Sequence, residues 1–162
     1  MATIIRVQNK VVTIAARAAV DPWFLSLASI PYTAALVFLP HGLKLAVVVS
    51  LQGPRYNNKT PRYTDYEKDL PKVSHLVKRL TSCHQNSFEF FTLFAPAVLL
   101  AKVAKADGKM VRAICVKISV LRTLYMLLYI IGAWDVIAAM RTVVWLIATT
   151  LNFDLYRVAL DL

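Results

Sequence analysis

Long apolar runs alternate with short polar connections along the whole chain. Four of these runs each contain a single charged residue. In chain order these residues are Lys44, Glu89, Arg122 and Arg141. A helix needs roughly 20 predominantly apolar residues to cross a bilayer, and each run is long enough or nearly so. The pattern therefore predicts four membrane-spanning helices, at about residues 31–51, 80–101, 113–134 and 136–153.

The connections between the runs favour neighbouring antiparallel helices. Residues 52–72 combine Gly, three prolines and mixed charges in a polar loop, whereas 102–112 form a short basic connection and the last turn is shorter still. Lipid satisfies no backbone hydrogen bonds, so helices are the plausible spanning form. We predict an all-α, up-and-down four-helix membrane bundle over residues 22–162. Pro31 suits an early turn of the first span, and Pro40 should kink it.

The first 21 residues form a separate segment. Arg6, Lys10 and Arg17 fall on one side of a helical projection, with apolar residues opposite and no acidic residue before Asp21. This pattern predicts a basic amphipathic helix over residues 1–21. It fits a segment lying along the lipid headgroups, and it also fits an organelle-targeting peptide.

Composition and charge point to the same class of protein. Of 162 residues, 58% are hydrophobic and 17% are charged, against roughly 25% charged in soluble domains. The net charge of +10 could indicate nucleic acid, but the basic residues flank the uncharged runs, which is a juxtamembrane pattern. Membrane lipids are therefore expected partners and nucleic acid is not. Cys83 and Cys115 lie in apolar runs without metal-ligand spacing, so neither a metal site nor a disulfide is expected.

Ionisable side chains within a span are costly and are usually paired, hydrated or bound to a ligand. At about 100° per residue, the polar residues of the last three spans form one stripe on each helix. The stripes consist of Arg79, Asn86 and Glu89, then Arg122, Tyr125 and Tyr129, then Arg141, Thr142 and Trp145. His84 points to another face, where we expect a packing or headgroup role.

Two interpretations of these stripes follow from their chemistry. Arginines bind carboxylates through forked hydrogen bonds, Asn86 suits an amide, and Glu89 can hold an ammonium. A tripeptide with two carboxylates and one amine matches that set. Alternatively, Glu89 and Arg122 pair with each other inside the bundle and bind nothing else.

Several motifs resemble those of one family of membrane proteins. The run from Arg79 to Glu89, RLTSCHQNSFE, resembles the R-x-x-x-x-H-x-N-x-x-E signature of the MAPEG superfamily, the membrane-associated proteins of eicosanoid and glutathione metabolism. The run YNNKTPR at 56–62 is similar to the N-x-x-P-R loop of its bacterial-type branch. RTLYMLLY at 122–129 is similar to the R-x-x-Y-x-x-x-Y motif of its third helix. The resemblance covers about residues 31–156.

The resemblance implies a homotrimer of four-helix subunits that binds glutathione, as cosubstrate, between neighbouring subunits. It implies glutathione contacts from Arg79, Asn86, Glu89, Arg122, Tyr125 and Tyr129. Arg141 would stand beside the sulfur as the catalytic residue, with Thr142 as an auxiliary hydroxyl. Tyr125 or Tyr129 is the alternative hydrogen-bond donor to the sulfur.

The expected activity is that of a membrane-embedded glutathione transferase or peroxidase acting on lipophilic electrophiles or lipid hydroperoxides. A non-catalytic lipid-binding scaffold is the alternative, since the superfamily includes one. Ser82 stands where several glutathione-activating members have a second basic residue, and Tyr125 replaces a histidine of some members. Intramembrane charges can also line an ion pathway, which is a third interpretation.

Overall fold

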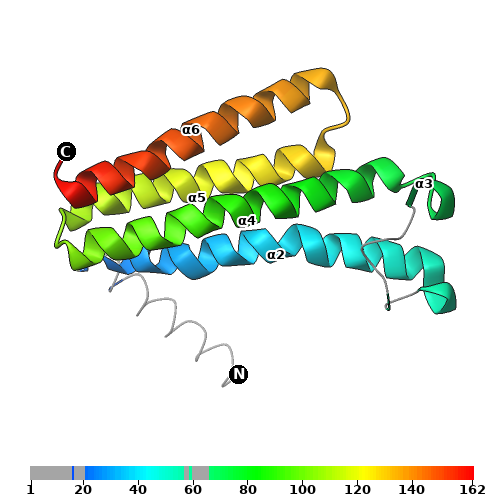
Figure 1. Cartoon of the computed structure of the whole chain (residues 1–162), viewed down its shortest axis with the longest axis horizontal. Helices are drawn as coiled ribbons and strands as arrows, with labels where there is room; N and C mark the ends of the chain where they lie inside the picture. Colours follow the sequence, from blue (N-terminus) through cyan, green and yellow to red (C-terminus); the bar gives the residue numbers. More distant parts are fainter. Residues whose placement is uncertain (1–15, 17–20, 57–58, 60–65) are drawn as a thin grey trace.

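The computed structural model describes residues 16, 21–56, 59 and 66–162, and these form a bundle of four long helices (Figure 1). A short 3-10 helix η1 and a single turn α3 lie in the first connection. The elements are α2 (Phe24–Gln52), η1 (Gly53–Arg55), α3 (Tyr66–Asp69), α4 (Ser74–Val103), α5 (Gly108–Ile131) and α6 (Asp135–Leu160). Each long helix has the length and apolar composition needed to cross a membrane. The predicted all-α four-span fold is confirmed.

The long helices extend past most of the predicted span limits. The first begins at Phe24 rather than near residue 31, and the last continues to Leu160 rather than 153. Apolar runs mark the part of a helix inside the hydrocarbon layer, whereas backbone hydrogen bonding continues through the polar flanks. The amphipathic helix predicted over 1–21 lies outside the described residues except for positions 16 and 21.

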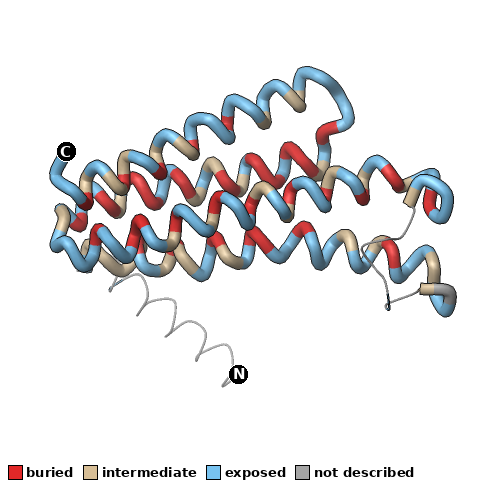
Figure 2. The backbone as a smooth tube through the Cα atoms, in the orientation of Figure 1, coloured by how far each residue is buried: buried red, intermediate tan, exposed pale blue. Residues whose placement is uncertain are grey.

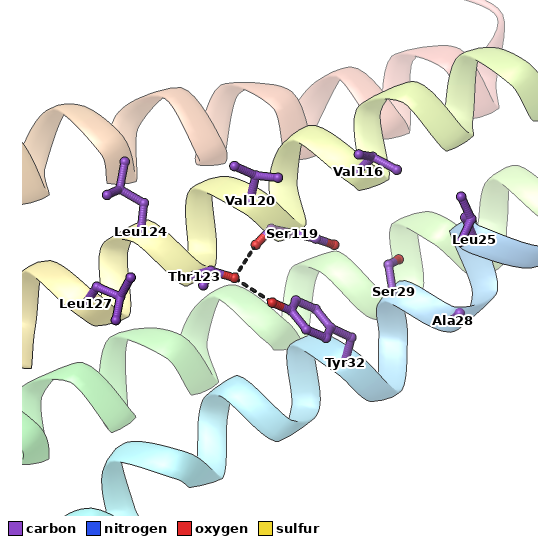
Figure 3. A pocket seen from close by; sticks show the side chains of 10 residues that line it. All are labelled: Leu25, Ala28, Ser29, Tyr32, Val116, Ser119, Val120, Thr123, Leu124 and Leu127. Carbon is purple, nitrogen blue, oxygen red and sulfur yellow. Dashed lines mark hydrogen bonds between the residues drawn. The ribbon is translucent and has the colours of Figure 1, made fainter. Parts of the chain in front are cut away.

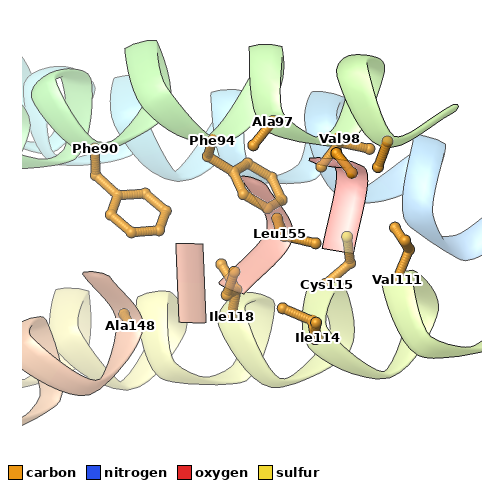
Figure 4. Packing of buried hydrophobic residues seen from close by; sticks show 12 residues of the cluster. Phe90, Phe94, Ala97, Val98, Val111, Ile114, Cys115, Ile118, Ala148 and Leu155 are labelled. Atoms are coloured by element: carbon orange, nitrogen blue, oxygen red, sulfur yellow. The ribbon is translucent and has the colours of Figure 1, made fainter. Parts of the chain in front are cut away.

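Helices that follow one another in the chain are antiparallel, and α6 diverges from α5 toward its own N-terminal end (Figure 1). α4 packs against α2, α5 and α6. Each helix buries an inward stripe and exposes the opposite face (Figure 2). Phe94, Ile118 and Leu155 pack together in the largest apolar cluster (Figure 4), near the end of the bundle where α6 stays close to α5.

Pro40 in α2 and Pro96 in α4 each have a side-chain donor from a neighbouring helix in the turn before them. Proline supplies no N–H and crowds the preceding turn, so carbonyls there need other donors in lipid. His84 Nδ1 donates to the carbonyl of Val37, three residues before Pro40, at 2.7 Å. His84 therefore packs against α2, as expected.

The second internal proline of this kind is Pro96 in α4. The Tyr156 hydroxyl, from α6, donates to the carbonyl of Leu93 at 2.8 Å. Leu93 again lies three residues before the proline, so the two contacts are equivalent. Both tie the turn before a proline to an adjacent helix.

Candidate functional site

A pocket of about 310 Å³ lies between α4, α5 and the diverging N-terminal half of α6. It gathers residues from all three predicted polar stripes. The lining residues are Asn86, Tyr125, Tyr129, Ala138, Arg141, Thr142 and Trp145. The three predicted catalytic residues, Arg141, Thr142 and Tyr125, are all among them.

Asn86 joins α4 to the two tyrosines of α5. Its Nδ2 donates to the hydroxyl of Tyr129 at 2.9 Å and to that of Tyr125 at 3.1 Å. The Tyr125 hydroxyl donates weakly to that of Tyr129 at 3.5 Å, and the two rings meet edge-on with centroids 5.0 Å apart. Because the Tyr129 oxygen accepts both bonds, its own proton can be donated to an atom in the pocket.

Arg141 brings a positive charge to this polar group from α6. Its guanidinium carbon lies 4.2 Å from the centre of the Tyr129 ring. Within the part of the chain that the structure describes, Arg141 Nε is buried and has no hydrogen-bond partner. A buried guanidinium donor without an acceptor is costly, so the pocket favours an anion.

Thr142 makes a weaker contribution to the pocket. Its hydroxyl donates to the carbonyl of Ala138 on its own helix, at 3.3 Å. A hydroxyl oxygen keeps acceptor capacity when its proton is donated in this way. Thr142 is therefore placed to accept a hydrogen bond, while Arg141 supplies the donors.

Arg122 lies behind the pocket rather than in its lining. It is 2% exposed, and its guanidinium carbon is 4.5 Å from the Phe90 ring centre and 4.3 Å from that of Tyr125. Nη2 donates to the hydroxyl of Ser87 at 3.0 Å, while Nη1 is buried with no partner among the described residues. Arg122 thus supports the Tyr125 ring from the core side and retains an unused donor.

Arg79 and Glu89 also lie outside the pocket lining. Arg79 Nε donates to the carbonyl of Tyr129 at 3.1 Å, in the last turn of α5, where helix carbonyls lack intrahelical partners. Glu89 is exposed on the outer side of α4. Among the described residues no ion pair joins Glu89 and Arg122, so the internal pairing considered from the sequence is not present in the subunit.

Ala138 is the lining residue that the sequence analysis did not single out. It lies three residues before Arg141 and so shares its side of α6. A small side chain at this position leaves room beside the guanidinium. Helical spacing from Arg141 was the available signal, but alanine carries no chemistry that marks a site.

The fold and the pocket define an integral membrane four-helix protein with a polar, cationic site between three of its helices. The sequence model of the MAPEG family matches residues 24–160, and the chain therefore belongs to this family. The family is associated with glutathione and eicosanoid metabolism. Neither a curated protein nor a solved structure matches the chain.

Proposed function

We propose that this protein is a glutathione-dependent transferase or peroxidase whose substrates are lipophilic. Glutathione would bind with its thiol in the pocket between α4, α5 and α6. The observation that carries the proposal is the buried Nε of Arg141, which has no partner among the described residues, beside Tyr125 and Tyr129. Together these groups offer a positive charge and a hydrogen-bond donor to one anionic atom.

The chemistry requires the glutathione thiol to lose its proton. A guanidinium beside the sulfur in a low-dielectric site stabilises the thiolate, which is the reactive nucleophile. The Tyr129 proton is available as a second donor to the sulfur, since Asn86 and Tyr125 both donate to the Tyr129 oxygen. Arg141 is the proposed catalytic residue, with Tyr125 and Thr142 completing the wall around the sulfur.

The thiolate would then react in one of two ways. With a carbon electrophile, sulfur forms a bond to carbon while the displaced electron pair leaves on the departing group or the adjacent carbonyl oxygen. With a lipid hydroperoxide, sulfur takes the terminal hydroxyl group as the O–O bond breaks, and the lipid alkoxide takes a proton from water to leave as the alcohol. A second glutathione then converts the sulfenic acid to a disulfide and water. Trp145 at the pocket wall offers an apolar surface to the lipid.

The rest of glutathione would extend toward a neighbouring subunit in a homotrimer. An extended tripeptide is roughly 10 Å long, so its charged ends would reach beyond the sulfur pocket. Glu89 is exposed and suited to the ammonium, while Arg79 and Arg122 are the cations proposed for the carboxylates. A neighbouring copy covering the outer side of α4 would exclude water from these contacts.

The decisive experiment measures glutathione binding and thiolate formation on the detergent-solubilised protein. We expect saturable binding by calorimetry and a glutathione-dependent rise in thiolate ultraviolet absorbance, with S-methylglutathione giving binding but no absorbance. Absence of glutathione binding would overturn the proposal. Binding without thiolate, and without turnover of a model electrophile, would favour the non-catalytic scaffold.

A further inference from the structure

A second, larger cavity of about 630 Å³ runs between α2 and α5 and shares no residue with the polar pocket (Figure 3). We call it the α2–α5 groove. Its lining residues are Leu25, Ala28, Ser29 and Tyr32 on α2, and Val116, Ser119, Val120, Thr123, Leu124 and Leu127 on α5. It occupies a surface that the proposed glutathione chemistry does not use.

The polar atoms of the α2–α5 groove are bonded to one another or to their own helices. The hydroxyls of Tyr32 and Thr123 share a hydrogen bond of 2.6 Å, and the Thr123 hydroxyl donates to the carbonyl of Ser119 (Figure 3). The Ser119 hydroxyl donates to the carbonyl of Cys115 on the same helix. The aliphatic side chains stay exposed, with Val120 at 63%. The surface presented to an occupant is therefore apolar, which suits an acyl chain.

A basic region continues the groove toward one end of the bundle. A neighbouring cavity shares Leu25 and Val116 with it and is also lined by Lys109, Arg112 and Lys117. Lys109 lies in the first turn of α5, where the positive end of the helix dipole makes a cation less favourable, and Arg112 and Lys117 follow on the same helix. An anion bound there would relieve both the repulsion among the cations and that from the dipole.

The headgroup level of a bilayer falls at this same end. The Trp23 ring lies over Gly108 at the start of α5 and is 4.6 Å from Lys102 Nζ, a pairing typical of a membrane interface. Side chains on a helix lean toward its N-terminus, so Lys117 is directed back toward this level. From Val116 to Leu127 the helix rises about 16 Å, close to one hydrocarbon leaflet of about 15 Å.

We propose that the α2–α5 groove and its basic end form a binding site for an anionic glycerophospholipid. Lys109, Arg112 and Lys117 would contact the phosphate and headgroup, and one acyl chain would lie along Val116, Val120 and Leu124. Asp107, the neighbouring carboxylate, accepts a hydrogen bond from the Lys109 backbone N–H and caps α5. Charge, length and apolar lining thus match one lipid molecule of a single leaflet.

The test is native mass spectrometry of the solubilised protein with dioleoyl phosphatidylglycerol or dioleoyl phosphatidylcholine, whose acyl chains are identical. We expect one tightly retained phosphatidylglycerol per subunit and weaker retention of phosphatidylcholine. Lys109→Gln with Lys117→Gln should weaken phosphatidylglycerol binding about fivefold for each lysine. Lys72→Gln with Lys105→Gln removes the same charge from exposed positions outside the groove and should leave retention unchanged.

A second pair of variants tests the apolar part of the site. Val120→Trp fills the groove and should reduce retention of phosphatidylglycerol, whereas Val143→Trp, on exposed α6 surface, should not. Equal retention of the two lipids, or no effect of Val120→Trp, would overturn the proposal. So would efficient cross-linking between subunits through Val120→Cys, which would show that a second copy of the chain covers the groove.

Discussion

The guanidinium carbon of Arg141 lies 4.2 Å from the centre of the Tyr129 ring, so a cation from α6 stacks on an aromatic residue of α5. This contact crosses the region where the two helices diverge, and it keeps Arg141 in the pocket although Nε has no partner among the described residues. The stack restrains the guanidinium plane while Arg141 lines the pocket.

Replacing Arg141 should separate thiolate stabilisation from glutathione binding. We expect Arg141→Ala to abolish the thiolate absorbance and to lower kcat by about 100-fold or more, as for loss of a preorganised charge contact. Arg141→Lys should recover part of the absorbance, because it restores the charge without the planar edge.

The matched control for Arg141 is Arg157→Ala on the same helix. Arg157 is exposed and pairs with Asp154 at 3.4 Å, so its loss should leave absorbance and kcat unchanged. An Arg141→Ala protein with normal thiolate absorbance would show that another group activates the sulfur.

The Tyr129 hydroxyl is predicted to act through its proton. Tyr129→Phe retains the ring that supports Arg141 but removes the oxygen that accepts from Asn86 and Tyr125. We expect kcat for conjugation to fall about tenfold, the cost of one net hydrogen bond of roughly 1.4 kcal/mol. Tyr156→Phe, which removes a structural hydroxyl bond to Leu93, should lower thermal stability without this kinetic loss. Equal kinetics in both variants would assign Tyr129 to packing alone.

Arg122 should prove more important for ligand binding than for the fold. It is buried and has no carboxylate partner in the part of the chain that the structure describes. A charge of that kind adds little to stability when an apolar side chain of similar volume can replace it. We expect Arg122→Met to change the free energy of unfolding in detergent by less than about 1.5 kcal/mol. Arg122→Ala should cost about 2–5 kcal/mol, because it leaves a cavity beside Phe90 and Tyr125. Both should weaken glutathione binding, and undiminished affinity in Arg122→Met would exclude Arg122 from the ligand site.

Much of the fold was predictable because the bilayer imposes a simple rule on sequence. Runs with a single charge each became α2, α4, α5 and α6, and the i, i+3, i+7 spacing on α5 placed Arg122, Tyr125 and Tyr129 on one side of that helix. Helix ends were missed by up to several residues, because hydropathy reports the hydrocarbon layer and not the last backbone hydrogen bond.

The site was predicted less completely than the fold. Helical periodicity shows which side of its own helix a residue faces, but not which neighbouring helix lies on that side. Asn86 and Glu89 are three residues apart, yet Asn86 turns toward the tyrosines of α5 and Glu89 remains exposed. The position of Arg141 depends on the backbone of the turn before α6 and on the angle at which α6 diverges from α5. No periodicity in the sequence encodes that angle.

Glu89 offers a test of the proposed subunit interface. Because its side chain is exposed, Glu89→Gln should leave the melting temperature of the unliganded protein unchanged. If Glu89 holds the glutathione ammonium, affinity should fall about tenfold, as for loss of a charge-assisted hydrogen bond. Asp161→Asn, at the C-terminal end of α6, is the control for removing one carboxylate. Binding that survives Glu89→Gln would place the ammonium elsewhere.

His84 belongs to the family-like motif, yet we predict a structural effect for its removal. His84→Leu keeps a similar volume but leaves the Val37 carbonyl without its donor, which should cost about 1–3 kcal/mol of stability. Glutathione affinity should not change, because His84 packs against Val37, Phe38 and His41 of α2 and not toward the pocket. Pro40→Ala removes the ring that crowds this turn, so the Val37 carbonyl could accept more fully from the His41 N–H, its α-helical donor. In a double-mutant cycle, measured by thermal unfolding in detergent, His84→Leu should therefore cost less in the Pro40→Ala background. Additive losses would mean that the His84 bond is independent of the proline.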